Sequence, residues 1–136
     1  MYQTIIVPVA MDQLERGEAI LGRARHLRAE GGRIVLLNVV EDFQGYLAID
    51  FPVELIEQEQ DQARLKLEAL RNRLGIAADI EVRYGGAARE IIKAAEELSA
   101  DLVIVASHRP GIANYLIGAT ADRVVRHCPV SVLVDR

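Results

Sequence analysis

The residues best suited to bind a ligand lie in one stretch that leaves a strongly apolar segment and ends where an amphipathic segment begins. Its candidate contacts are Ala106, Ser107, His108, Arg109, Gly118, Ala119 and Thr120. The first turn of a helix has backbone N–H groups without partners and carries the positive end of the helix dipole. Small residues let an anion approach that backbone closely. We therefore expect an anion site here, although strand-to-helix turns also use glycine and serine for their geometry alone.

Several other kinds of site are not indicated. The sequence has no GxxxxGK[ST] loop, no GxGxxG after the first apolar segment and no GxSxG turn, which argues against P-loop, dinucleotide and α/β-hydrolase chemistry. The three histidines are scattered and do not show metal-ligand spacing. Ser107 and His108 are adjacent, and adjacent side chains on an extended chain point apart, so they do not form a nucleophile and base.

Short apolar segments alternate with amphipathic ones along the chain. Gly31-Gly32 is expected to close the first helix, because glycine tolerates a left-handed cap. Alternation of strands and helices predicts an α/β fold, a doubly wound parallel sheet with helices on both faces, in one domain of residues 1–136. The expected strands are 4–9, 33–40, 79–84, 102–106 and 129–134, and the expected helices are 14–30, 53–74, one that carries Ile91 to Leu98, and 118–127.

Such a sheet binds ligands beyond the carboxyl ends of its strands. In this sequence that rule selects residues 8–12, 38–41, 85–86 and 106–120. Pro8 cannot donate to a strand ladder, so it either shapes the crevice or simply ends the strand.

Composition narrows the class of protein. The formal net charge is -4 and no basic stripe is visible, so nucleic acid is not an expected partner. No apolar run approaches the length of about 20 residues that a membrane helix needs, so membrane insertion is not expected. Cys128 is the one cysteine and is expected to be buried. Because a single cysteine cannot form an internal disulfide, a reducing, cytoplasmic setting is expected.

The last part of the chain, ASHRPGIANYLIGATADRVVRHCPVSVLV, resembles the C-terminal signature of the universal stress protein family. The opening MYQTIIVPV and the Gly85-Gly86 turn also fit, and the match is nearest to a short bacterial branch with a Ser-His-Arg-Pro loop. The resemblance implies a five-stranded adenine nucleotide alpha hydrolase-like fold with strand order 3-2-1-4-5. It also implies that the chain binds an adenine nucleotide, with ATP as the leading candidate and Mg²⁺ as its companion ion.

ATP-binding members of the family carry the motif G-x2-G-x9-G-[ST]. Its glycine positions map to Ala106, Arg109 and Gly118, the last after eight residues, and its hydroxyl position maps to Ala119. The family's aspartate after Val-Pro-Val maps to Ala10. We hypothesise that Asp12 and Thr120 supply the carboxylate and hydroxyl instead. Pro8 and Val9 complete the first strand's contribution, and Val39 and Val40 are expected to offer backbone groups to the adenine base.

The last strand is expected at a sheet edge, where an apolar strand can pair with another chain. The resemblance implies a homodimer through residues 130–134, with a tetramer as a further possibility and a regulatory protein as the partner. Two functions remain open: a nucleotide-binding stress module, or a dimeric interaction protein that has lost the nucleotide. Catalysis is not expected beyond very slow ATP hydrolysis, because neither a general base nor a lysine is placed to assist it.

Overall fold

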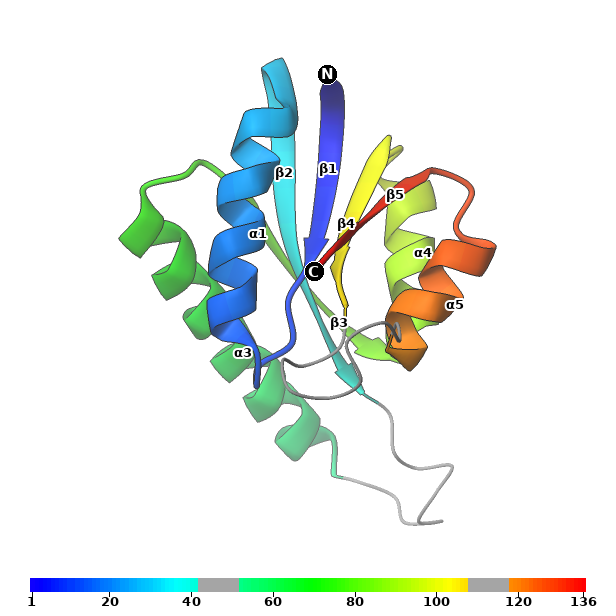
Figure 1. The fold of residues 1–136 in the computed structure, drawn as a ribbon. Helices are drawn as coiled ribbons and strands as arrows, with labels where there is room; N and C mark the ends of the chain where they lie inside the picture. Colours follow the sequence, from blue (N-terminus) through cyan, green and yellow to red (C-terminus); the bar gives the residue numbers. More distant parts are fainter. Residues whose placement is uncertain (42–51, 108–117) are drawn as a thin grey trace.

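The computed structural model describes residues 1–41, 52–107 and 118–136. The sheet is five-stranded and parallel, with the order β3-β2-β1-β4-β5, as predicted (Figure 1). Its strands are β1 (Tyr2–Pro8), β2 (Arg28–Glu41), β3 (Asp79–Gly85), β4 (Leu102–Ala106) and β5 (Ser131–Asp135). Its helices are α1 (Leu14–Leu27), α3 (Val53–Leu74), α4 (Ala87–Glu97) and α5 (Ala119–His127). Within the described residues, no helix is both long enough and apolar enough to cross a membrane.

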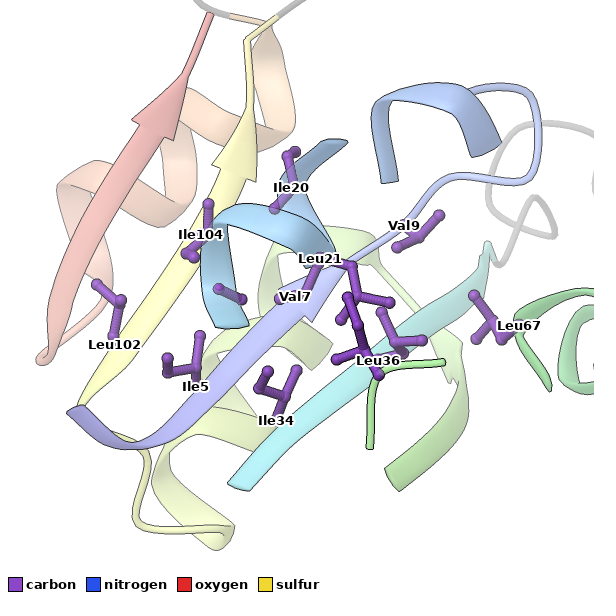
Figure 2. Packing of buried hydrophobic residues seen from close by; sticks show 12 residues of the cluster. Ile5, Val7, Val9, Ile20, Leu21, Ile34, Leu36, Leu67, Leu102 and Ile104 are labelled. Atoms are coloured by element: carbon purple, nitrogen blue, oxygen red, sulfur yellow. The ribbon is translucent and has the colours of Figure 1, made fainter. Parts of the chain in front are cut away.

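Two apolar layers hold the helices to the sheet. Helices α1 and α3 cover one face and α4 and α5 the other (Figure 1). Side chains of β1 alternate between the two layers: Ile5 and Val7 pack toward α1 and α3, while Ile6 packs toward α4 and α5. Figure 2 shows the first layer, in which Ile20 and Leu21 of α1 lie over the strands. Aliphatic side chains fill both layers, which agrees with the low aromatic content of 4%.

The boundary between α1 and β2 differs from the prediction. Helix α1 ends at Leu27, and β2 already begins at Arg28, which pairs with Tyr2. Gly31 and Gly32 therefore lie inside a strand and do not cap a helix. The pairing of β1 with β2 shifts register there, and Gly31 has φ +77. A Cβ on Gly32 would lie 2.9 Å from the Gln3 carbonyl oxygen, so the strand irregularity itself requires glycine.

The C-terminal segment also differs in detail. The last strand is Ser131–Asp135, so it begins two residues and ends one residue later than the expected 129–134, and it lies at the sheet edge as predicted. Cys128 is half-buried, so the prediction of a buried thiol was wrong. It follows α5 directly and packs only partly against the layer beneath α4 and α5.

Helix α1 packs closely against the end of β1 at Gly17. This residue is buried, and a Cβ built on it would lie 2.7 Å from Cγ1 of Val9. Real carbon contacts lie at about 3.5–4.0 Å. Glycine at this position therefore sets how close the first turn of α1 can come to the end of β1.

Candidate functional site

A cavity of about 350 Å³ opens at the carboxyl ends of β1 and β4, where the chain order in the sheet reverses. Apolar side chains from Val105 and Ile91 lie on its α4 side. Nine of the predicted site residues line it: Pro8, Val9, Ala10, Val39, Ala106, Ser107, Gly118, Ala119 and Thr120. The cavity therefore gathers the ends of three strands and the start of α5.

A second hollow of about 400 Å³ adjoins the first and contains the remaining described candidates. Asp12 and Val40 line it, together with Glu59 and Lys66 of α3. Ala10, Asn38, Val39 and Glu41 border both hollows. The predicted contacts His108 and Arg109 lie outside the described residues.

The start of α5 presents backbone donors to the first cavity. Gly118 is the N-cap, with φ -61 and ψ 158, and as a glycine it has no side chain with which to cap the helix. The first intrahelical bond runs from Asp122 N–H to the Gly118 carbonyl at 2.8 Å. The N–H groups of Ala119, Thr120 and Ala121 therefore precede the helix hydrogen-bond ladder, and all three residues line the cavity. Small side chains leave this positive helix end open to an anion.

The end of β2 presents backbone groups from the opposite side. Val9 N–H donates to the Leu37 carbonyl at 2.8 Å, and the register of β1 with β2 ends at Pro8 and Leu37. Backbone groups alternate between the two sides of a strand, so those of Val39 point the same way as those of Leu37. They lie past the end of β1 and face the cavity that Val39 lines.

Asn38 lies in the expected stretch 38–41, but it was not among the residues predicted to contact the ligand. It is 6% exposed, and its Nδ2 donates to the Val9 carbonyl at 2.8 Å. This hydrogen bond holds the residue that follows β1 against β2, at the border between the two hollows. A single amide inside the apolar run Ile34 to Val40 was the available signal, because buried polar groups need a partner.

Ser107 is held by the end of β5. Its N–H donates to the Asp135 carbonyl at 2.9 Å, and Nη2 of Arg16 donates to the same oxygen at 2.7 Å. The Asp135 carboxylate is buried and forms ion pairs with Arg16 and Arg23 of α1. The exit of β4, the last strand and α1 are thus joined beside the cavity.

Glu41 belongs to the same expected stretch as Asn38 and also lines the cavity. The lining residues that were missed are Gln13, Leu37, Ala87 and Ala121, along with Ile91 and Val105. Ala87 follows the Gly85-Gly86 turn, which the sequence had marked, but the turn itself does not line the cavity. In the described part of the chain, no group of three His, Cys, Asp or Glu side chains could hold a metal ion.

Comparison with known proteins agrees with this geometry. The profile of the universal stress protein family matches residues 1–136. Universal stress protein G of Escherichia coli O157:H7 is 32% identical over 142 residues, covering all of both chains. The structure of the hypothetical protein MJ0577 has a TM-score of 0.81 at 25% identity and covers 98% of this chain and 95% of that one.

A universal stress protein from Archaeoglobus fulgidus, solved in complex with dAMP, shares the fold with a TM-score of 0.63 at 16% identity. The match covers 99% of this chain and 98% of that one. The profile and the full-length relative establish the family independently of that distant likeness. This chain belongs to the universal stress protein family.

Proposed function

We propose that this protein binds an adenine nucleotide, with ATP as the leading candidate, in the cavity at the ends of β1 and β4. The observation that carries the proposal is the pairing of two features across one cavity. The start of α5 offers N–H groups to phosphates, and the backbone of Val39, which lies past the last residue of β1 paired with β2, offers hydrogen bonds to a purine base. The dAMP bound to the A. fulgidus relative supports the choice of ligand class.

The residues present fit such a ligand. The cavity volume of about 350 Å³ falls in the usual range for small-molecule sites, and its walls are mainly aliphatic with polar groups at the ends. Gly118 has ordinary backbone angles, so its value lies in leaving room for a phosphate. Thr120 lines the same cavity, next to the family position that Ala119 occupies.

The ribose end is where this chain departs from the family pattern. Ala10 replaces the aspartate, and Asp12 lies in the adjoining hollow with Lys66 and Glu59. We assign Asp12 to the ribose, reached across the border that Ala10 and Val39 share between the two hollows. A charge-assisted bond from a buried carboxylate would add about 1.5–3 kcal/mol, and an exposed one adds less.

The proposal extends to how the protein works. Nucleotide binding tunes a cytoplasmic homodimer joined through β5, with Mg²⁺ accompanying ATP and a regulatory protein as the partner. A tetramer is the larger assembly considered. The protein binds ATP without turning it over at enzymatic rates, and a steady turnover above about 1 per second would contradict this.

The first test is the thermal midpoint with and without Mg-ATP, with GTP as the control nucleotide, on protein freed of bound nucleotide. Ligand at 100 times its Kd adds about 2.7 kcal/mol of stability. The midpoint then rises by roughly 2–8 °C for each kcal/mol. A rise with ATP and none with GTP supports an adenine site.

Variants then locate the site. Gly118→Val and Thr120→Val should each reduce the ATP-induced shift, and Asp12→Ala should weaken binding at least several-fold. Asp79→Ala is the matched control for charge, because Asp79 is an exposed carboxylate at the opposite, amino end of β3. Ala10→Asp should strengthen binding. Unchanged affinity in Asp12→Ala would remove that residue from the site.

Ala10 and Ala119 favour a second candidate function, a dimeric interaction protein without nucleotide. No thermal shift at millimolar ATP, together with a dimer in light scattering, would support it.

A further inference from the structure

A cationic groove lies between α4 and α5, with a volume of about 780 Å³. Arg89 and Lys93 stand one turn apart on α4, about 6 Å along the axis, and Arg123 and His127 stand likewise on α5. Among the described residues that line it, Glu96 is the one carboxylate. This is a positive surface on a protein whose formal net charge is -4.

The cationic side chains of the groove form no close ion pair within the described residues. Across residues 1–41, 52–107 and 118–136, no ion pair involves Arg89, Lys93 or Arg123, and all three side chains are exposed. Glu97, the carboxylate one turn beyond Lys93, is bonded at 2.7 Å to Arg83 on another face. An acidic occupant would therefore meet little competition in this groove.

The first half of α3 carries the complementary surface. Glu54, Glu57 and Asp61 follow one another at helical spacing, with Val53 and Leu65 at the two ends of the same face. At 100° per residue, these five positions fall within about 120° of the helix surface, and the exposed Arg64 lies near the Val53 edge of the same span. All are exposed, and Val53 and Leu65 are among the most exposed large apolar side chains, at 63% and 65%. We call this set the acidic face of α3.

Nothing within the described residues covers the acidic face. Its three carboxylates form no ion pair there, and the face lies away from the core side of α3, where Ala63 and Leu67 are buried. In Figure 1 this part of α3 extends past the lower ends of the strands. Exposed apolar side chains beside a patterned charge are typical of a helix that docks in a groove.

We propose that two copies of this chain associate by placing the acidic face of α3 from one copy in the α4/α5 groove of the other. Glu57 and Asp61 lie one turn apart, about 6 Å along their helix, which matches the spacing of Arg89 and Lys93 on one side of the groove. Ile92 lines the groove and gives Val53 or Leu65 an apolar contact. The interface joins two different surfaces, so it is heterologous, and it is separate from the β5 edge.

Sedimentation velocity over a concentration series tests the proposal. Wild-type protein should associate at low salt, and the association should weaken at least about tenfold near 0.5 M NaCl, where the screening length falls to about 4 Å. The groove-reversed variant is Arg89→Glu with Arg123→Glu, and the face-reversed variant is Glu57→Lys with Asp61→Lys. Each alone should lose at least about tenfold in association constant, which corresponds to the loss of close charge pairs.

Mixing provides the decisive measurement. The groove-reversed variant keeps its acidic face and the face-reversed variant keeps its basic groove, so a labelled sample of one should bind the other at near wild-type affinity. Arg25→Glu with Arg126→Glu is the control, because it makes the same change in net charge on exposed arginines outside the groove. Circular dichroism verifies that each variant is folded.

Three results would overturn the proposal. They are a wild-type protein whose sedimentation does not change with salt, reversed variants that associate as well as wild type, and a mixture that fails to restore association. Loss in the groove-reversed variant alone would mean that the groove takes an acidic surface other than α3, and the assigned occupant would be wrong. A β5 dimer that survives all four substitutions is compatible with the proposal, because the two interfaces are separate.

Discussion

Replacing Gly17 by alanine tests how tightly α1 is fitted against the end of β1. The new Cβ would lie 2.7 Å from Cγ1 and 3.1 Å from Cγ2 of Val9, well inside the carbon contact distance of about 3.5–4.0 Å. Forcing an extra methyl into a packed site costs about 1–3 kcal/mol. Alanine in a helix interior returns up to about 1 kcal/mol. The free energy of unfolding of Gly17→Ala should therefore fall by roughly 0–2 kcal/mol.

Gly22 is the matched control, since it lies in the same helix and a Cβ there meets nothing within 4 Å. Gly22→Ala should raise the free energy of unfolding by up to about 1 kcal/mol. Urea unfolding at 25 °C should separate the two variants by about 1–3 kcal/mol with equal m-values. Adding Val9→Ala to Gly17→Ala should reveal a favourable coupling of about 1–3 kcal/mol, because the methyl group introduced by Gly17→Ala then fills the space that the valine side chain vacates. Equal stability of Gly17→Ala and Gly22→Ala would refute the steric argument.

Two further variants test bonds to the exit and the start of β1. Asn38→Ala removes the hydrogen bond to the buried Val9 carbonyl and should lower the free energy of unfolding by about 1–3 kcal/mol. Asn72→Ala, which changes an exposed amide, is the control and should change the free energy of unfolding by less than about 0.5 kcal/mol. Equal effects of the two substitutions in urea unfolding would contradict the role of Asn38. Burial raises the pKa of Asp101, but its bonds from the N–H groups of Gln3 and Thr4, both 2.9 Å, outweigh this and hold the pKa below its ordinary value. A lowered pKa gives stability that is present above the unfolded-state pKa of about 4 and is lost as pH falls through the folded-state pKa. Asp101→Asn should flatten that acid limb in unfolding measured from neutral pH downward, and an unaltered pH slope would remove the carboxylate from the explanation.

The parallel sheet could be predicted because each strand is a short aliphatic run between helical segments, whereas its strand order was predicted from the resemblance to the universal stress protein family. The α1–β2 boundary could not be predicted, since it depends on pairing between distant residues. Gly31 looked like a helix cap by its local sequence, yet Tyr2 pairs with Arg28 and draws the preceding residues into β2. Cap and periodicity patterns report on one segment of the sequence, whereas this boundary depends on the pairing of two strands that are distant in sequence.

The location of the site followed from topology, but the assignment of side chains to each hollow did not. Gln13 N–H donates to the Ala10 carbonyl at 3.0 Å, which closes a turn after β1. That turn directs Asp12 to the hollow beside α3, while Gln13 lines the first cavity. The directions of consecutive side chains in a turn depend on backbone angles that no spacing rule supplies.

The alternating side chains of β1 have a consequence for how this protein loses its structure. Ile5 and Val7 belong to one apolar layer and Ile6 to the other, so a single central strand is part of both. Detaching either pair of helices would expose one face of that strand to water and remove half of its packing. Unfolding of one pair of helices alone is therefore unfavourable in free energy. Both layers should unfold in a single cooperative transition, with calorimetric and van't Hoff enthalpies that agree.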